Sequence, residues 1–449
     1  MSSKWLYHSQ RWYKQQLVVQ RYYMNKDKHI PQGYKNSPLG IIPKEWEVKR
    51  LGDVCDYVDY RGKSPNKSSE GIFLITAKNI REGHIDYDVS KEYIPEEDYA
   101  EVMRRGKAEV GDVLITTEAP LGHVAQIDTP YVALAQRVIK YRGKEVIENT
   151  FLKYFLMSEI FQKILIANAT GSTALGIKGS RLHQLPIIIP SITEQTIITT
   201  ILCLWDTAIE KQSELIEKLT LRKSALMQQL LTGKKRLPGF SGKWQEKKLR
   251  GIGIFLSNNT LSREQLNISS GDVHCIHYGD VLIKYPSIID CEKETMPFIN
   301  ENAYKESMID FIENGDIIIS DTAEDETVGK TCEIQNVGNK KILAGLHTML
   351  LRPNKGLFAP CFLGYYINSE AYHKKLIPLI QGIKVCSIGK KAIQNTTIAI
   401  PPLEEQKAIA SVLVKADKEI ELAKEKLASL QTQKRGLMQQ LLTGKKRVV

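Results

Sequence analysis

The chain has 449 residues, and its 62 Lys and Arg against 51 Asp and Glu leave a net charge of +11. This length exceeds what a single hydrophobic core usually supports, so two or more domains are expected. No run of about 18 apolar residues occurs and the N-terminus lacks the apolar core of a signal peptide, which favours a soluble, cytoplasmic protein. The basic surplus favours a nucleic acid as partner, and less often an acidic membrane surface or protein.

The seven cysteines bear on redox state and metal binding. No two of them form a C-x-x-C pair and their number is odd, which favours reduced thiols over a disulfide framework or a zinc site. They are Cys55, Cys203, Cys275, Cys291, Cys332, Cys361 and Cys386. No metal site is predicted.

An N-terminal extension, residues 1–35, is aromatic and basic and has no counterpart later in the chain. It is interpreted either as a short amphipathic helix that lies on a partner or as a loosely ordered extension.

The first module, residues 36–190, is predicted as an α+β domain. Its strands are predicted from short runs rich in Ile, Val, Thr and Tyr that are bounded by turn residues. These runs are residues 71–80, 111–122, 131–141 and 184–190. A helix is predicted over Thr150–Ile166, where apolar residues recur at spacings of three and four.

A long helix with a different pattern is predicted within residues 191–236. Its apolar positions advance in alternating steps of four and three, as in the seam of a coiled coil. Ser191 or Thr193 is the expected N-cap, and Gly233 is the expected C-terminal stop. The polar seam residue Lys223 is interpreted as fixing register.

The second half of the chain repeats this order. The second module, residues 237–401, has predicted strands at 274–280, 315–322, 341–353 and 395–402 and a predicted helix at 361–377. A second seam helix follows within residues 402–449, with Lys434 at the position of Lys223 and Gly444 at that of Gly233.

The repeat is nearly perfect at its end. The eleven residues LMQQLLTGKKR occur at Leu226–Arg236 and again at Leu437–Arg447, an offset of 437 − 226 = 211. Earlier landmarks show smaller offsets, as insertions and deletions in loops produce. Two equivalent helices most simply pair antiparallel about a pseudo-two-fold axis, with one module at each end. The alternative is two independent helices buried in a larger core.

Motifs for catalysis are absent from the sequence. No phosphate-binding loop, nucleophile elbow, H-E-x-x-H or metal-spaced cluster of His and Cys occurs. Ile400-Pro401-Pro402-Leu403 lacks the polar first residue and the aromatic last residue of the amino-methyltransferase tetrad, so it is interpreted as a joint between strand and helix. The chain is therefore not predicted to be an enzyme by itself.

The order of module, helix, module and helix resembles the specificity subunit of type I restriction-modification systems. Segments similar to ones that recur in that family are Tyr34–Val48, Asp59–Pro65, Leu74–Ile80, Thr117–Gly122, Ile276–Asp280 and Pro402–Gln406. The resemblance runs from about Tyr34 to Arg447. The predicted fold class is thus α+β, with two pseudo-symmetric α/β target recognition domains separated by a long antiparallel two-helix coiled coil.

The resemblance implies a division of labour. Each target recognition domain, 36–190 and 237–401, would read one half of a bipartite asymmetric DNA sequence. The helices would set the gap and dock two modification subunits. Those subunits would hold S-adenosylmethionine and methylate adenine, while restriction subunits would cleave DNA with ATP and Mg²⁺. No cofactor is expected on this chain.

Candidate DNA contacts are polar residues of the predicted loops, because loops can reach base edges or phosphates while strand interiors must pack. In the first module they are Arg61, Lys63, Lys67, Lys78, Asn79, Arg81, Thr117, Glu118, Lys178 and Arg181. In the second module they are Asn258, Asn259, Arg263, His277, Tyr278, Thr322, Glu324, Lys384, Lys390 and Lys391. Each can also be an ordinary solvated residue, which is the interpretation favoured for Arg104 and Arg105.

The basic ends of the repeat are candidate docking sites for partners. They comprise Lys234, Lys235, Arg236, Lys445, Lys446 and Arg447. They can touch phosphates, dock the modification subunit or cap their helices, and two equivalent sites predict a two-to-one assembly. Two hypotheses compete with the specificity subunit for the whole chain. The first is a coiled-coil scaffold with two protein-binding modules, and the second is a stand-alone enzyme.

Overall fold

The structure is a computed structural model that describes residues 30–60, 65–172, 174–300, 303 and 310–448. It divides into two compact units, and each is described by itself. Unit 1 comprises residues 1–211 with 427–449, and unit 2 comprises residues 212–426. Of the predicted N-terminal extension, residues 1–35, residues 1–29 lie outside the described residues, and its last two residues begin strand β1 (Tyr34–Ser37).

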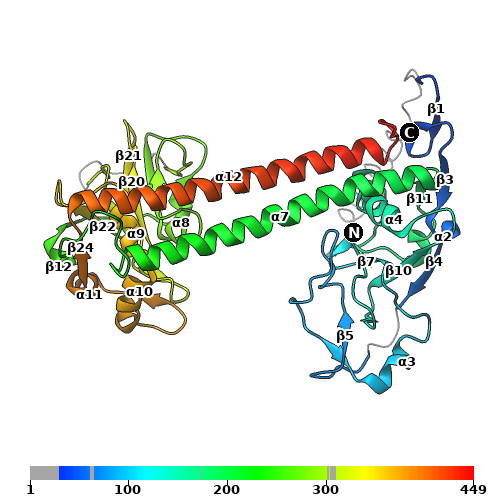
Figure 1. The fold of residues 1–449 in the computed structure, drawn as a ribbon, viewed down its shortest axis with the longest axis horizontal. Coiled ribbons are helices and arrows are strands. Elements are labelled where there is room, and N and C mark those ends of the chain that lie inside the picture. Colours follow the sequence, from blue (N-terminus) through cyan, green and yellow to red (C-terminus); the bar gives the residue numbers. More distant parts are fainter. Residues whose placement is uncertain (1–29, 61–64, 173, 301–302, 304–309, 449) are drawn as a thin grey trace, which may run out of the picture. The chain divides into compact units, whose positions relative to one another are not determined.

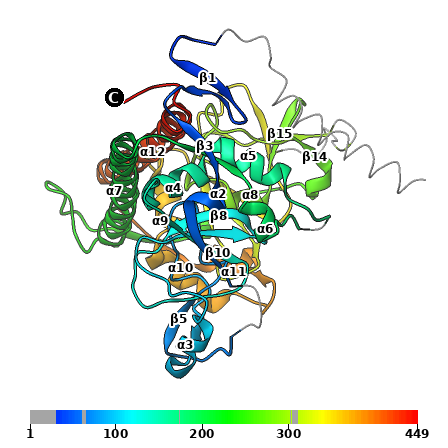
Figure 2. The ribbon, with the colours of Figure 1, turned by 90° about the vertical axis from the view of Figure 1, so that its right-hand side faces the viewer.

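Unit 1 is built on a four-stranded antiparallel sheet in the order β4-β10-β7-β8. These strands are β4 (Cys55–Asp59), β10 (Val138–Gly143), β7 (Val113–Thr117) and β8 (Leu121–Gln126). Helix α4 (Asn149–Met157) packs on this sheet, and α5 (Glu159–Ala167) follows it (Figure 2). Their buried faces, with Phe151, Phe155 and Phe161, form the core between helices and sheet.

Smaller elements complete unit 1. A sheet in the order β6-β5-β9 and helix α3 lie at the end of the module remote from β3 (Figures 1 and 2). The bounds are β1 (Tyr34–Ser37), β2 (Gly40–Pro43), β3 (Glu47–Arg50), α2 (Leu51–Val54), β5 (Ile72–Ile75), β6 (Tyr93–Ile94), α3 (Tyr99–Val102), β9 (Ala133–Leu134), α6 (Gly179–Leu182) and β11 (Pro186–Ile189). Strand β3 pairs antiparallel with β11, which ties the start of the module to its end.

Unit 2 repeats this plan with one added strand in each of the two corresponding sheets. Its main sheet has the order β13-β22-β18-β20-β16, made of β13 (Gly253–Leu256), β22 (Thr348–Pro353), β18 (Ile317–Ser320), β20 (Thr331–Gln335) and β16 (Ile288–Asp290). The second sheet has the order β14-β17-β15-β21, made of β14 (Leu266–Asn267), β17 (Phe298–Ile299), β15 (Val273–Ile276) and β21 (Lys341–Ala344). The remaining elements are β12 (Gln245–Lys248), α8 (Tyr278–Ile283), β19 (Thr322–Ala323), α9 (Phe362–Ile367), α10 (Glu370–Leu376), β23 (Cys386–Ser387), α11 (Lys390–Asn395) and β24 (Thr397–Ile400). Strand β12 pairs with β24 as β3 pairs with β11.

Three kinds of sequence prediction about local structure are wrong. Two of them are wrong in both modules, and the third is wrong in the second module. Each predicted module helix is two helices, because Ser158 and Ser369 adopt extended backbone and their side chains cap α5 and α10. The segments 131–141 and 341–353 each form two strands instead of one. The predicted strand at 274–280 ends at Ile276, and His277 caps the helix α8 that begins next to it.

The two long helices begin and end as predicted. Helix α7 spans Ile192–Leu230 and α12 spans Leu403–Leu441. The N–H of Glu194 donates to the Ser191 hydroxyl at 3.3 Å, which makes Ser191 the N-cap. Gly233 and Gly444 both have φ +69°, the left-handed conformation that ends a helix.

The helices pair antiparallel within each unit, as predicted. In unit 1 the first turns of α7 lie beside the last turns of α12 (Figure 1), where Lys434 forms an ion pair with Asp206. In unit 2 the amide of Gln212 donates to the carbonyl of Ala423 at 2.9 Å. The seam positions that the sequence identified are the less exposed positions of both helices.

A tyrosine, an aspartate and a lysine join each module to the helix pair. In unit 1 the Tyr154 hydroxyl of α4 donates to Asp206 at 2.5 Å, and Lys434 binds the other carboxylate oxygen while its Nζ lies 5.3 Å from the centre of the Tyr154 ring. In unit 2 Tyr365 donates to Asp417 at 2.6 Å, with Lys223 at 2.5 Å from Asp417 and 5.3 Å from the Tyr365 ring. Each seam lysine is therefore bound to the opposite helix.

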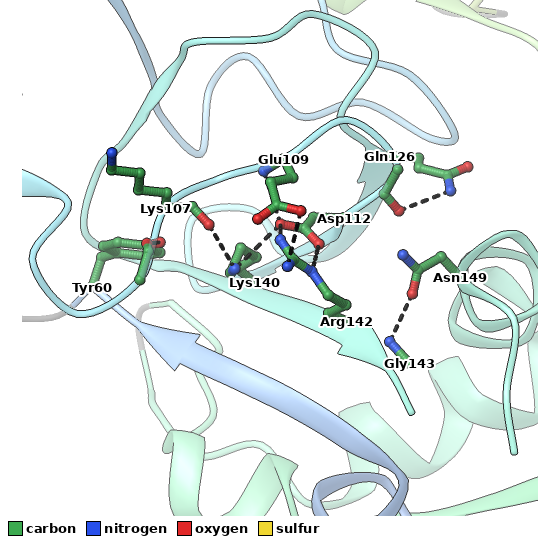
Figure 3. A network of polar contacts seen from close by, with 11 residues as sticks. Tyr60, Lys107, Glu109, Asp112, Gln126, Lys140, Arg142, Gly143 and Asn149 are labelled. Carbon is green, nitrogen blue, oxygen red and sulfur yellow. Dashed lines mark hydrogen bonds and ion pairs between the residues drawn. The ribbon is translucent and has the colours of Figure 1, made fainter. Parts of the chain in front are cut away.

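A buried aspartate organises the main sheet of each module. Figure 3 shows Arg142, Lys140 and Glu109 around Asp112, which is 1% exposed. Arg142 donates to both carboxylate oxygens at 2.6 and 2.8 Å. Burial opposes ionisation of Asp112, but the hydrogen bonds from Arg142 and from the Glu109 N–H, with the charge of Lys140, outweigh it and lower the pKa of Asp112.

The second module keeps this arrangement with one difference. Arg352 donates to both oxygens of Asp316 at 2.9 and 2.7 Å, and the Glu313 N–H donates to the same carboxylate. In unit 1 a second cation, Lys140, lies 3.2 Å from Asp112. In unit 2 the described residues supply Asp316 with one cation, Arg352.

We expect Arg352→Ala to destabilise its module more than Arg142→Ala destabilises the other. A buried carboxylate left without its cation costs about 3–5 kcal/mol, and only Asp112 retains a lysine. Hydrogen exchange of peptides that cover β18 and β22, compared with β7 and β10, measures each module separately. Equal acceleration in the two variants would contradict this account of Lys140.

A buried glutamate marks a second difference between the modules. Glu333 of β20 is 2% exposed and accepts hydrogen bonds from the backbone N–H groups of Cys361 and Gly364 at 2.5 and 2.8 Å. Burial raises the pKa of Glu333 to about 7, against the opposing effect of these hydrogen bonds. Strand pairing places Gln126 of β8 at the equivalent position in unit 1, opposite Val113 as Glu333 is opposite Ile317.

Because of Glu333, we expect the stability of unit 2 to depend on pH in a way that unit 1, with Gln126 at the equivalent position, does not share. Because the pKa of Glu333 in the folded protein is above its unfolded value of 4.5, its contribution to stability is present below pH 4.5 and is lost as the pH rises through about 7. Relative to Glu333→Gln, the wild-type protein should lose on the order of 2–3 kcal/mol between pH 5 and 8. Urea unfolding monitored by exchange in β20 and α9 measures this; parallel curves for the two proteins would rule it out.

Candidate nucleic-acid interface

Most of the basic candidates of the first module lie on its surface. Lys67, Lys78, Lys178 and Arg181 are exposed and Arg81 is half-buried. Lys67 forms an ion pair with Glu92, Arg81 with Asp86, and Arg181 donates to the side chain of Asn168. Arg61 and Lys63 lie outside the described residues. Contact of these side chains with DNA stays a prediction.

Asn79 is not on the surface, contrary to its place among the candidates. Its side chain is 0% exposed, its oxygen accepts hydrogen bonds from Thr76, and its amide donates to the carbonyls of Asp86 and Val89. It therefore holds together the loop that follows β5 and cannot reach a base edge.

The second module uses Asp280 at the equivalent place after β15. Asp280 is 6% exposed and accepts two hydrogen bonds from Arg263, at 2.8 and 2.6 Å. The candidate Arg263 is thus exposed but oriented by a buried carboxylate. His277 is 7% exposed, and its ring caps α8, so it is a structural residue at the edge of the surface.

The remaining candidates of the second module differ in exposure. Asn258, Glu324, Lys384, Lys390 and Lys391 are exposed, while Asn259, Tyr278 and Thr322 are half-buried. Asn258 donates to the carbonyl of Gly345, Asn259 accepts from the Leu261 N–H, and Lys390 lies over the ring of Phe255.

The structure brings several candidates together around two residues that sequence reasoning missed. In unit 1 Glu118 forms an ion pair with Arg137, beside the buried Thr117. In unit 2 Tyr278 and Thr322 surround His347. The signal in the sequence was a polar residue inside each apolar run, at the same position in 131–141 and 341–353.

The basic ends of the repeat divide into two classes. Lys234, Lys235, Lys445 and Lys446 are exposed and remain candidates for docking. Arg236 and Arg447 are instead only partly exposed and are bound inside their own units, and their docking of a partner stays a prediction. Arg447 donates to both oxygens of Glu194 at 2.7 and 3.1 Å, and Arg236 donates to both oxygens of Glu405.

The same two glutamates also bind the tryptophan that begins each module. Trp46 Nε1 donates to Glu194 at 2.8 Å, and Trp244 Nε1 donates to Glu405 at 3.1 Å. The side chains of Glu194 and Glu405 are 1% and 0% exposed. Each copy of LMQQLLTGKKR thus anchors the end of one long helix to the start of a module and to the first turn of the other helix.

Comparison with known proteins identifies this arrangement. A family model for the type I restriction modification DNA specificity domain matches residues 43–221 and again residues 242–432. The chain belongs to this family. The two matches coincide with the two repeats, so each module with the first part of its helix is one copy of the family's domain.

Relatives and solved structures agree with the family. The chain is 26% identical to the protein assigned as the type I restriction enzyme MjaX specificity subunit of Methanocaldococcus jannaschii, over 93% of this chain and 97% of that one. It is 24% identical to the MjaVIII specificity subunit of the same organism, over 91% and 94%. The fold is similar to the S subunit of a type I restriction-modification system from M. genitalium, with a TM-score of 0.52, 14% identity and coverage of 92% and 98%. It is also similar to a chain from a study of assembly and conformational transition of the type I R-M system, with a TM-score of 0.58, 18% identity and coverage of 90% and 99%.

The protein is a specificity subunit of a type I restriction-modification system, and the modules are DNA-recognition domains. The scaffold hypothesis is not favoured. No helix in the described part of the chain is long and apolar enough to cross a membrane.

We expect Arg447→Ala to loosen the end of α12 from its module, whereas the double variant Lys445→Ala/Lys446→Ala leaves it in place. The first change leaves Glu194 buried without its cation, which costs about 3–5 kcal/mol. The second removes two exposed charges that hold no buried partner. Hydrogen exchange of peptides 437–448 measures the difference, and equal exchange in the two variants would show that the ion pair does not anchor the helix.

Proposed function

We propose that each module reads one half of a bipartite, asymmetric sequence in double-stranded DNA and that the antiparallel helices fix the gap between the halves. In this proposal the chain catalyses no step. It binds DNA within a complex that methylates adenine and, with restriction subunits, cleaves DNA with ATP.

The observation that carries the proposal is a repeated scaffold with diverged loops. Both modules hold a buried aspartate between a glutamate and an arginine, yet the surface loop residues differ, as with the exposed Lys78 and Lys178 in the first module against Gly279 and Gly389 in the second. A shared framework places loops alike on DNA, while different side chains select different base pairs. Two unlike readers in one chain suit an asymmetric site rather than a palindrome.

The proposed partners follow from the duplication and the charge. Exposed Lys234 and Lys235 in unit 2 and Lys445 and Lys446 in unit 1 offer two equivalent surfaces, which support binding of two methyltransferase subunits. S-adenosylmethionine, ATP and Mg²⁺ belong in this proposal to the partner subunits. Because DNA is the proposed target, the proposed location is the cytoplasm.

The decisive experiment exchanges one module and reads the methylated sequence. Replacing residues 55–185 with the matching part of a relative keeps β3, β11 and the Trp46–Glu194–Arg447 contacts. Co-expressed with its methyltransferase partner, this chimera should change one half of the methylated site and leave the other half and the gap unchanged. Sequencing of modified adenines in the host's DNA measures this.

The reciprocal exchange of residues 253–395 is the matched control, because it keeps β12 and β24. It should change only the other half-site. A methylated sequence that is the same for the wild type and both chimeras would disprove the proposal.

A further inference from the structure

Two residues that lie within predicted strands adopt a backbone conformation that side chains disfavour. Arg137 has φ +71° and His347 has φ +56°, and neither is glycine. They directly precede β10 and β22. A non-glycine residue in the left-handed region is strained, and such strain persists where the surrounding structure imposes it, often at functional sites.

The two positions are equivalent in the two modules. The N–H of Thr117 donates to the carbonyl of Arg137 at 2.9 Å, and that of Asp321 donates to the carbonyl of His347 at 3.1 Å. The residues that follow them also correspond, because Val138 pairs with Thr116 and Thr348 with Ser320.

A further loop is attached to each strained turn by the same bond. The N–H of Ile177 donates to the carbonyl of Thr117, and the N–H of Ile388 donates to the carbonyl of Asp321, both at 2.9 Å. The same backbone arrangement of three separate segments therefore occurs in both modules, while the side chain at its centre is arginine in the first and histidine in the second.

Both side chains are exposed and oriented by an acidic neighbour. Arg137 is 52% exposed, and its Nε lies 2.8 Å from Oε1 of Glu118. His347 is 46% exposed, and its Nδ1 lies 3.4 Å from Asp321 and 3.3 Å from the Thr322 hydroxyl. The Tyr278 ring meets the His347 ring edge to face, with centroids 5.3 Å apart. Exposed ion pairs contribute little to stability, so these contacts do not explain why a strained turn with an exposed polar side chain is kept in both modules.

We propose that Arg137 and His347 are base-reading residues, one in each half-site. An arginine fork matches the O6 and N7 acceptors of guanine in the major groove, and Glu118 at Nε holds the guanidinium plane with its other nitrogens free to donate. His347 donates a ring N–H to a purine acceptor in the second half-site. This inference rests on the proposed function, because it assumes that each module faces one half-site.

A base contact and a phosphate contact have different consequences. Removing a phosphate contact weakens all sequences alike and reduces the salt dependence of binding by about one unit. Removing a base contact relaxes discrimination at one position and leaves the other positions unchanged.

The experiment uses Arg137→Gly and His347→Gly in the complex with the methyltransferase subunits. Glycine removes the side chain and suits the positive φ, so the fold is retained. Modified adenines are first mapped with the wild-type complex. Duplexes that vary each specified base pair of that site are then assayed for methylation with every variant.

Arg137→Gly should reduce discrimination at one G·C pair of the first half-site by roughly 10- to 100-fold, with the second half-site unaffected. His347→Gly should reduce discrimination at one base pair of the second half-site and leave the first half-site unaffected. Arg137→Lys should not restore the discrimination, because a lysine cannot form the bidentate contact.

The matched control is Arg104→Ala, which removes an exposed arginine paired with a carboxylate in the same unit, Glu101 at 3.0 Å, and should change no discrimination. Uniform loss of methylation with discrimination intact at every position would overturn the assignment of Arg137 and His347. If the wild-type complex methylates no split sequence, the proposed function fails, and this inference fails with it. If the wild-type complex methylates a split site and both glycine variants keep its discrimination unchanged, the proposed function stands and only the assignment of Arg137 and His347 is disproved.

Discussion

A buried carboxylate in the first turn of each long helix is the constraint on which each unit depends. Glu194 and Glu405 lie almost fully out of solvent, and each accepts hydrogen bonds from a tryptophan and from an arginine. The tryptophan begins a module and the arginine ends the other helix. In each unit three distant parts of the chain therefore meet at one glutamate carboxylate. A buried ion pair contributes little net stability relative to apolar packing, but it penalises any arrangement that leaves the charge alone. Its value here is that it selects one packing.

The other buried polar groups extend the same logic into the module and along the helices. Asp206 and Asp417 bind a module tyrosine and a lysine of the opposite helix, so module, helix and partner helix share one carboxylate in each unit. Asp112 and Asp316 then fix the central strands of the sheet. Each module is held at its base and in its sheet by charges that must stay paired, and this leaves its loops free to differ without loss of the framework.

The helix pair was largely predictable because its signal is periodic and long. The seam, the Ser191 cap and the glycines at 233 and 444 are local patterns with one structural interpretation each. The modules were predicted less well, because a polar residue inside a short apolar run does not by itself show that the run is broken into two strands. Arg137 and His347 were missed since nothing in a propensity scale marks a polar residue with positive φ. Asn79 was misjudged for the opposite reason: its chemistry suits a surface contact, and only the tertiary structure shows that its side chain is buried and already hydrogen-bonded within its own loop.

A side chain that discriminates between bases must be placed before it meets them. A long arginine on a mobile loop would lose rotamer entropy on binding, and this loss would reduce its preference for a correct base pair. At position 137 the backbone is fixed because the Thr117 N–H donates to the Arg137 carbonyl. The position of Thr117 is fixed in turn, because the pairing of β7 with β10 sets the register of the adjacent strands. Glu118 restricts the guanidinium further. The same frame at position 347 orients a histidine with Asp321 and Thr322. Specificity can then diverge by exchange of one side chain on a preserved frame, which is what two unlike copies of one module require.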